Sequence, residues 1–304
     1  MTRHLGLDLG GTAIKTAVLE VAGEQTSIVG TGSAPTNADG GPLVVIERLI
    51  ETGKAAIAEH GPVETVGLGV PGLFDRDRGT IELFPNLPGP WKGQQIRQPL
   101  EDALEVPVTL INDARAFSLA EATLGAGRGC ETVVCLTLGT GVGGGVVIEG
   151  KVRLGAWGKA GEIGHQIVQP DGPRCGCGNR GCVEALTKAE VLTSLAGKDT
   201  VEEVYRSAAA GDARSREAIE TVADWLAIGL ANTIATLGPD RIVIGGGIVA
   251  AGEAVLEPIR RHLRERVTLV PPDEIQVVAA QLGPKAGAVG AALAPLAAQA
   301  VRAR

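Results

Sequence analysis

Apolar residues follow two spacings along the chain, and these spacings alternate from segment to segment. Leu5–Gly10 and Ala13–Glu20 lead into and out of a glycine pair, which is typical of a hairpin with a tight turn. In Pro42–His60, apolar residues recur every three to four positions, which is the period of an amphipathic helix. The other expected strands are Thr65–Val70, Pro107–Ile111, Thr132–Leu138, Gly145–Val152, Arg241–Ile244 and Glu274–Ala279; the other expected helices are Ile96–Leu104, Ala114–Leu124, several within Lys188–Leu237, Glu253–Val267 and Ala286–Arg302. Strands that alternate with helices indicate an α/β protein.

The first hairpin has a second, weaker copy in the chain. When Leu7–Glu20 is aligned with Leu136–Glu149, five of fourteen positions are identical. Both segments read as a strand, a glycine turn with a threonine, and a strand. The repeat indicates two similar domains, each offering a glycine turn to a shared cleft.

Composition and charge narrow the function classes. The chain has 304 residues, a length that suits two domains or one large one, and a net charge of −7. Its seven aromatic residues and its lack of a long basic run argue against a protein that binds nucleic acid or a membrane surface. No apolar run is long enough for a membrane span, and the first residues lack the apolar core of a signal peptide. We therefore expect a cytoplasmic protein.

Glycine-rich turns bring backbone N–H groups close to phosphates, and three versions are common. The Walker sequence is absent. The dinucleotide pattern occurs at Gly67–Gly72 and Gly139–Gly144, but neither copy opens a helix, which excludes a nicotinamide enzyme. A strand–turn–strand phosphate loop fits Asp8–Thr12 and Leu138–Gly145. Each of these two turns could equally be a plain tight turn.

Three of the five cysteines lie within eight residues, downstream of a histidine. His165, Cys175, Cys177 and Cys182 have the spacing His-x9-Cys-x-Cys-x4-Cys. One imidazole and three thiolates form a closed tetrahedral zinc set, which leaves no open position for a water and so predicts structural Zn²⁺. Cys130 and Cys135 stand apart and are expected to be ordinary buried residues.

The whole chain resembles the ROK family of bacterial sugar kinases, within the actin/hexokinase-like phosphotransferase superfamily. The resemblance rests on an ordered set of motifs: Leu5–Thr12, Gly69–Gly72, Asn112-Asp113, Leu138–Gly145, Gly161–His165, Cys175–Glu184 and Ile244–Gly247. It implies an α/β, two-domain actin/hexokinase-like (ribonuclease H-like) fold with a cleft between the domains. The expected small domain is 1–113 plus 288–304, and the expected large domain is 114–287 with the zinc loop.

The resemblance also implies ATP and Mg²⁺ and a role for each matching residue. Asp113 is the expected general base, although an aspartate before a helix can also be a plain cap. Asp8 would face Mg²⁺, usually through water, and His165 would use one ring nitrogen for zinc and the other for sugar. The sugar contacts implied are Gly72, Asn112, Asp113, Glu162, His165 and Glu184. The residues implied to bind ATP and Mg²⁺ are Asp8, Gly10, Gly11, Thr12, Lys15, Gly139, Thr140, Gly141, Gly143, Gly245, Gly246 and Gly247.

Several of these residues also have a plainer explanation. Gly245–Gly247 could serve close packing of a helix on a strand, and Asp8 could be an exposed strand carboxylate. Glu162 and Glu184 could be solvated surface charges. Two positions depart from the family pattern, which commonly has Glu and Asn where this chain has Ile111 and Arg115. These departures put the identity of the sugar in doubt.

The expected activity is phosphorylation of a hexose at its 6-hydroxyl. The sugar expected before the others is glucose, which would give glucose 6-phosphate. Alternatives are a kinase for fructose, mannose, N-acetylglucosamine or N-acetylmannosamine, and a sugar-sensing repressor. The repressors of the family carry a DNA-binding domain before the first phosphate loop, and here that loop begins at Asp8. A polyphosphate donor needs a basic stripe, which the sequence does not show. The partners expected are a hexose and further copies of the chain, as a homodimer or homotetramer.

Overall fold

The computed structural model describes residues 1–85, 87–156, 158–271 and 274–302, and the chain divides into two compact units. The first unit is Met1–Leu124 with Pro284–Arg304, and the second is Gly125–Gly283. The expected boundaries lay after residues 113 and 287, so the division differs by one helix and by a few residues at the C-terminal side. Ala303 and Arg304 lie outside the described residues.

The first unit contains a five-stranded mixed sheet in the order β3-β2-β1-β4-β7. A separate hairpin, β5-β6, follows β4. The strands are β1 (Thr2–Leu9), β2 (Ala13–Ala22), β3 (Gln25–Pro35), β4 (Thr65–Val70), β5 (Leu73–Asp75), β6 (Thr80–Leu83) and β7 (Val108–Asn112). The helices are η1 (Ala38–Gly40), α1 (Gly41–His60), α2 (Arg97–Leu104), α3 (Asp113–Leu124), η5 (Gly283–Lys285) and α9 (Ala286–Arg302).

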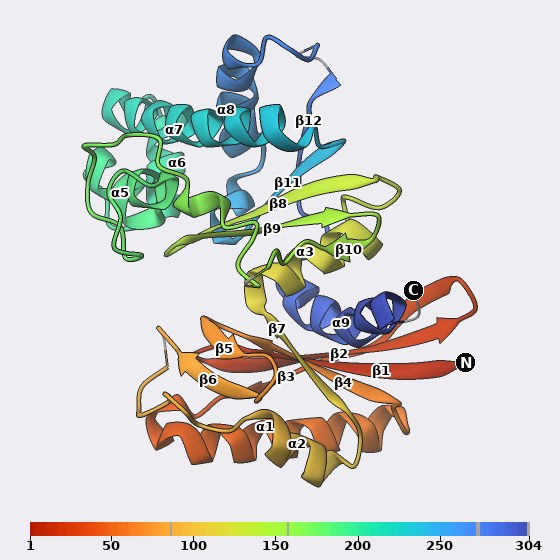
Figure 1. Ribbon diagram of the computed structural model, residues 1–304. Coiled ribbons are helices and arrows are strands. Elements are labelled where there is room, and N and C mark those ends of the chain that lie inside the picture. Colours follow the sequence, from red (N-terminus) through yellow and green to blue (C-terminus); the bar gives the residue numbers. More distant parts are fainter. Residues whose placement is uncertain (86, 157, 272–273, 303–304) are drawn as a thin grey trace. The chain divides into compact units, whose positions relative to one another are not determined.

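Helices cover both faces of this first sheet. Figure 1 shows α1 and α2 on one face and α9 on the other. The approach of α9 is close, because a Cβ atom on Gly6 or Gly67 would overlap the α9 backbone. Helix α3 continues from β7 without a loop and packs on α9, where a Cβ on Gly290 would overlap the Ala116 carbonyl. These contacts explain why α3 belongs to the first unit.

The second unit contains a five-stranded mixed sheet in the order β10-β9-β8-β11-β12. Its strands are β8 (Thr132–Leu138), β9 (Val142–Ile148), β10 (Lys151–Val152), β11 (Arg241–Gly245) and β12 (Gln276–Ala279). Its helices are η2 (Ile163–His165), α4 (Val183–Thr187), α5 (Ala189–Ala196), α6 (Val201–Ala209), α7 (Ala213–Leu237), η3 (Gly247–Ala251) and α8 (Glu253–Arg266). A single apolar core joins the sheet to these helices, with Leu136, Leu192, Leu230 and Ile259 among its buried members.

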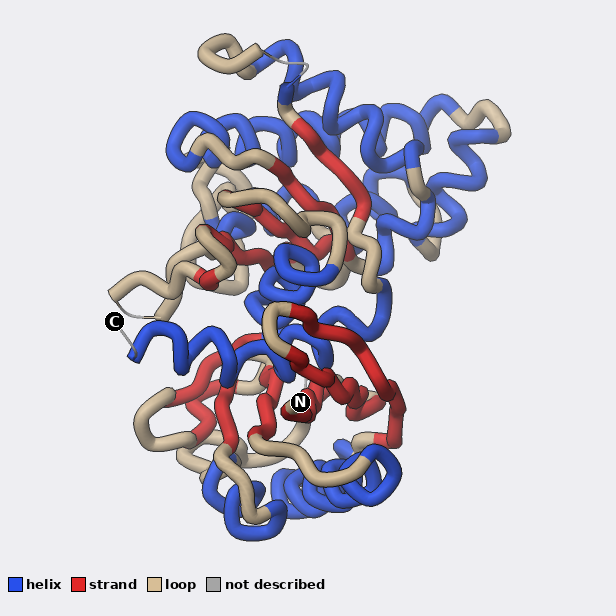
Figure 2. Tube along the Cα trace, turned by 90° about the vertical axis from the view of Figure 1, so that its right-hand side faces the viewer, coloured by secondary structure: helices blue, strands red, loops and turns tan. Residues whose placement is uncertain are grey.

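The two units repeat one strand order. In each, the first two strands and the third form an antiparallel meander, and two parallel strands extend the sheet on the other side of the first strand. The tube in Figure 2 shows the strands of each unit grouped together, with helices around them. The weak sequence repeat of Leu7–Glu20 and Leu136–Glu149 therefore falls on equivalent hairpins, β1-β2 and β8-β9.

The main differences from the sequence prediction concern strands. Strands β3, β5 and β6 were not expected; β3 is largely exposed and lacks an apolar face. The strand expected at Gly145–Val152 is two strands, β9 from Val142 to Ile148 and β10 at Lys151–Val152. Glycines lie within β9 because the strand passes close to other backbone: a Cβ on Gly144 would lie 2.6 Å from the Cys135 carbonyl oxygen.

Hydropathy along the helices gives no support for a membrane span. Within the described ranges, no helix is both long and apolar enough to cross a bilayer.

Candidate active site

Three parallel strands of the first unit end at one edge of the sheet and bring the predicted residues there together. The register pairs Asp8 of β1 with Gly69 of β4, and Val70 of β4 with Asn112 of β7. Gly72 follows β4 directly, and Asp113 follows β7. Open α/β sheets bind ligands at the carboxyl ends of their strands, so this edge is the expected place for chemistry.

The first glycine turn connects β1 to β2. The Gly10 N–H donates to the Ala13 carbonyl at 3.0 Å, which closes the turn. Thr36 fixes the turn from outside: its hydroxyl donates to the Gly10 carbonyl at 2.7 Å, and its N–H donates to the Thr12 carbonyl at 3.0 Å. Thr36 is fully buried, and no pattern in the sequence marks it. The turn is therefore rigid before any ligand binds.

Asp8 is a half-buried carboxylate beside this turn. Burial raises the pKa of the Asp8 carboxyl to about 6; the Lys15 ammonium opposes the rise and the negative charge of Asp113 adds to it. The first turn of α9 passes over Asp8, since a Cβ on Gly287 would overlap its carboxylate. Asp8 is thus enclosed by its own unit, and the explanation as a simple exposed strand carboxylate does not apply.

Asn112 and Asp113 form the junction between β7 and α3. The Asn112 Oδ1 atom accepts from the Ala114 N–H at 3.1 Å and the Arg115 N–H at 3.3 Å, so Asn112 caps the helix. Its Nδ2 donates to the Gly72 carbonyl at 3.3 Å. Asp113 Oδ1 accepts from the Ala114 N–H at 2.8 Å. Asp113 therefore shares the cap, and this role is compatible with chemistry at the sheet edge.

Arg115 occupies the interior beneath these two residues. The side chain is 3% exposed, and its guanidinium donates to Asn112 Oδ1 at 3.2 Å. Because the Asn112 oxygen accepts from three donors of α3, the amide has one orientation and presents its N–H side to Gly72. This contact was not predicted from the sequence, in which Arg115 is a departure from the family pattern.

The second unit brings its two glycine turns side by side. Gly245 at the end of β11 pairs with Thr137 of β8, directly before the Gly139–Gly141 turn. Gly246 lies against this turn, because a Cβ there would overlap the backbone of Leu138. Its φ of 92° also favours glycine. Gly246 thus packs closely on the backbone of strand β8 and not on a helix, as the plainer explanation for Gly245–Gly247 expected, whereas space is open around Gly139 and Gly247.

One predicted nucleotide residue lies outside the turn. Gly143 belongs to β9, where it pairs with Thr137. The turn itself is shorter than expected and is closed by the Gly139 N–H, which donates to the Gly141 carbonyl at 3.0 Å. The turn itself therefore consists of Gly139, Thr140 and Gly141, and the role of Gly143 in nucleotide binding stays a prediction.

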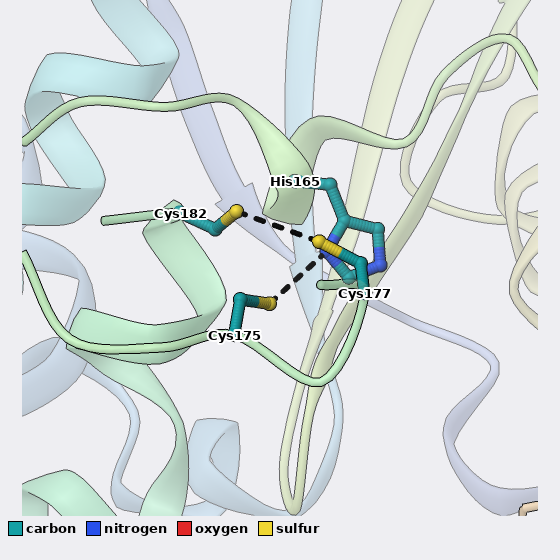
Figure 3. Close-up of side chains that lie close together, drawn as sticks. All are labelled: His165, Cys175, Cys177 and Cys182. Carbon is teal, nitrogen blue, oxygen red and sulfur yellow. Dashed lines mark hydrogen bonds between the residues drawn. The ribbon is translucent and has the colours of Figure 1, made fainter. Parts of the chain in front are cut away.

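The four predicted zinc ligands converge in the second unit. Their ligand atoms all lie within 4.8 Å of one another. Figure 3 shows them pointing to one centre, with Cys175 Sγ 3.6 Å from His165 Nδ1 and Cys177 Sγ 3.7 Å from Cys182 Sγ. His165 ends η2, Cys182 precedes α4, and the other two cysteines lie in the loop between them.

These distances fit a metal ion. Zinc bonds of about 2.0–2.3 Å in a tetrahedron place neighbouring ligands about 3.5–3.8 Å apart. Burial raises the pKa of the Cys175 thiol to about 12, so a nearby positive charge is needed to hold it as a thiolate. His165 offers Nδ1 to this centre, which leaves Nε2 for another partner. The donor set and its spacing therefore suit structural Zn²⁺.

The two glutamates of the zinc loop have different surroundings. Glu162 precedes η2 and is half-buried; its carbonyl accepts from the His165 N–H at 3.0 Å. Glu184 in α4 is not a solvated surface charge. Its Oε2 accepts from the Val142 N–H at 2.9 Å, and its Oε1 lies 3.5 Å from Cys175 Sγ. This contact with the glycine turn was not expected.

Comparison with known proteins agrees with this arrangement. A glucokinase from Halalkalibacterium halodurans is 33% identical over 94% of this chain and 93% of its own length. A ROK hexokinase structure from Thermus thermophilus is 37% identical, with a TM-score of 0.85 over 98% of this chain and 100% of that one. A ROK family glucokinase from Streptomyces griseus, solved with glucose and AMPPNP, is 34% identical, with a TM-score of 0.76 over 98% and 99%.

Two units with one repeated strand order, each with a glycine hairpin, define a phosphotransferase fold of the actin/hexokinase-like class, as expected. The ROK family model matches residues 4–298, and the chain belongs to that family.

Proposed function

We propose that this protein is an ATP-dependent hexose kinase that phosphorylates the 6-hydroxyl, with glucose as the first substrate to test. The observation that carries the proposal is the sheet edge of the first unit, where Asn112 and Asp113 join Asp8 and a rigid glycine turn. The similarity to a glucokinase solved with glucose and AMPPNP supports the choice of sugar and donor.

In the proposed reaction, Asp113 accepts the proton of the sugar hydroxyl while its oxygen attacks the γ-phosphorus. The bond between that phosphorus and the β–γ bridging oxygen breaks, and ADP leaves. Mg²⁺ would neutralise charge on the phosphates, with Asp8 facing it. The turns Gly10–Thr12 and Gly139–Gly141 supply backbone N–H groups, Lys15 adds a positive charge, and Gly245–Gly247 leaves room for the nucleoside.

By the resemblance, the proposed sugar contacts are Gly72, Asn112, Asp113, Glu162, His165 and Glu184. Asn112 and the backbone at Gly72 belong to the first unit, whereas Glu162 and His165 belong to the second. Zinc would fix the imidazole through Nδ1, so that Nε2 can meet a hydroxyl. In this proposal the metal is structural and takes no part in phosphoryl transfer.

The proposal is tested by ADP release with ATP and a panel of hexoses, repeated with polyphosphate as donor. We expect glucose to give the highest kcat/KM and ATP to be the donor. Faster turnover of fructose, mannose or an N-acetylated hexosamine would keep the kinase and change its substrate. If no sugar raises ADP release above the sugar-free rate, while a hexose still binds, the chain is a sugar-sensing protein.

A further inference from the structure

Glu184 connects two features that the sequence treats separately. It is the second residue of α4 and lies two positions after the zinc ligand Cys182. One carboxylate oxygen accepts from the Val142 N–H at 2.9 Å, and the other lies 3.5 Å from Cys175 Sγ. A single side chain therefore touches a zinc ligand and the first residue of β9.

Val142 directly follows the Gly139–Gly141 turn. Gly141 admits the carboxylate, because a Cβ there would lie 2.7 Å from Glu184 Oε2. A second link lies on the other side of the turn, where the Ala189 N–H donates to the Gly139 carbonyl at 2.8 Å. The Gly139–Gly141 turn is thus held at both ends, by Glu184 of α4 and by Ala189 of α5.

A carboxylate beside a turn that binds phosphate would repel the phosphate, because both groups are negatively charged. Here Glu184 uses the Val142 N–H, which lies at the base of the turn, and leaves the N–H groups of Thr140 and Gly141 to other partners. Its effect is to fix the turn rather than to compete with a phosphate. The zinc loop, with little regular structure of its own, depends on its ligands to hold Glu184 in this position.

We propose that Glu184 is a positioning residue that ties the zinc site to the nucleotide turn, so that metal occupancy sets nucleotide affinity. This rests on the proposed function, which assigns the Gly139–Gly141 turn to the phosphates. Through this link, loss of zinc weakens nucleotide binding even in the absence of sugar.

The experiment compares Glu184→Ala with the conservative Glu184→Gln. Two quantities are measured without sugar: the exchange rate of the Val142 amide hydrogen, and the Kd of a non-hydrolysable ATP analogue by calorimetry. Glu184→Ala should speed exchange and weaken nucleotide binding, each by about tenfold, which is typical for loss of a hydrogen bond to a charged group. Glu184→Gln keeps an acceptor and should stay within about threefold of wild type.

A matched control is Glu217→Ala. Glu217 is an exposed carboxylate of helix α7 in the same unit. It should change neither quantity. Zinc content, measured on each variant, should remain at the wild-type value, which shows that the loop is still folded.

Zinc removal by a chelator provides the second arm. In the wild-type protein, zinc removal should raise the Val142 exchange rate and the nucleotide Kd about as much as Glu184→Ala does. In the Glu184→Ala variant, zinc removal should add little to either, because both changes break the same link. The proposal is overturned if Glu184→Ala raises the sugar KM but leaves Val142 exchange and nucleotide Kd unchanged. The proposal is also overturned if the effects of zinc removal and of Glu184→Ala on nucleotide Kd are fully additive. A chain that binds nucleotide but phosphorylates no sugar refutes the proposed function alone.

Discussion

Asp8 and Asp113 lie at the same edge of the first sheet, and their charges act on each other. Asp113 sits at the start of α3, where its Oδ1 accepts from the Ala114 N–H at 2.8 Å. Asp8 is enclosed between two strands and α9, where burial opposes ionisation. Two carboxylates in such different surroundings are suited to different tasks.

Asp113→Asn tests the general base. The amide keeps the shape and most hydrogen bonds but cannot accept the proton, so kcat should fall at least about a hundredfold, with little change in sugar binding. Steady-state kinetics with saturating glucose and ATP measures this. Asn112→Ala should instead raise the sugar KM, with a loss of about 1 kcal/mol in stability for the missing cap. Retention of more than about a tenth of wild-type kcat by Asp113→Asn would place the base elsewhere.

Asp8→Asn should stabilise the free protein while removing its activity. The pKa of Asp8 in the folded chain, about 6, exceeds the ordinary value of 3.8. Ionisation of Asp8 therefore destabilises the folded protein as the pH rises above 3.8, and this effect is complete above pH 6. At pH 8 the variant should be more stable by about 1–3 kcal/mol. The gain should shrink to about half at pH 5 and vanish only below pH 3.8.

Urea unfolding at each pH measures this difference between Asp8→Asn and wild type. Asp39→Asn, which changes an exposed carboxylate of the same unit, should leave stability unchanged. An equal gain at pH 5 and pH 8 would mean that shape, not charge, explains the effect.

At the scale of elements, the described residues of the zinc loop, which runs from β10 to α4, have only η2 and isolated bridges as regular structure. Helix α4 has five residues, too few to be stable alone. The order of this segment therefore depends on its contacts and on the four converging ligands.

Cys177→Ser tests this dependence cleanly, because Cys177 is exposed and its replacement removes little packing. We expect zinc content to fall well below one ion per chain and the sugar KM to rise, since the loop carries Glu162 and His165. Elemental analysis and steady-state kinetics measure the two effects. Cys130→Ser, at a half-buried cysteine outside the cluster, should keep both at wild-type values.

Elements with a strong local signal were predicted closely. The strand Thr65–Val70 and the helix Ala286–Arg302 have the predicted bounds, because one is a short buried run without charged residues and the other is rich in alanine. The strand β3 was missed because it exposes alternate polar residues and its stability comes from pairing with β2. Sequence pattern cannot show such pairing.

The residues of the candidate site likewise differ in how far the sequence predicts their contacts. The zinc ligands were predicted because residue type and spacing are local information, and their atoms do converge. The contacts of Thr36 with the first turn and of Glu184 with Val142 join residues 24 or more positions apart. They follow from the fold, and no motif in the sequence marks them.

At the scale of the whole molecule, the first unit depends on close backbone contact between its sheet and α9. Gly67→Ala places a Cβ against the Ala291 carbonyl and should cost about 1–3 kcal/mol in unfolding free energy. Zinc content should not change, because the zinc loop belongs to the other unit. Gly247→Ala, where space is open, should have a much smaller effect on stability. Equal losses in both variants would show that the α9 contact is not the cause.

Helix α9 also sets the order in which the protein can be completed during synthesis. The ribosome makes residues 1–124 first, yet the face of their sheet that α9 covers has no partner until residues 284–302 emerge. The second unit is continuous in sequence and can fold while that tail is still in the exit tunnel. The N-terminal part of the chain is thus the last to be finished, and the sheet face that α9 covers stays uncovered by α9 until then.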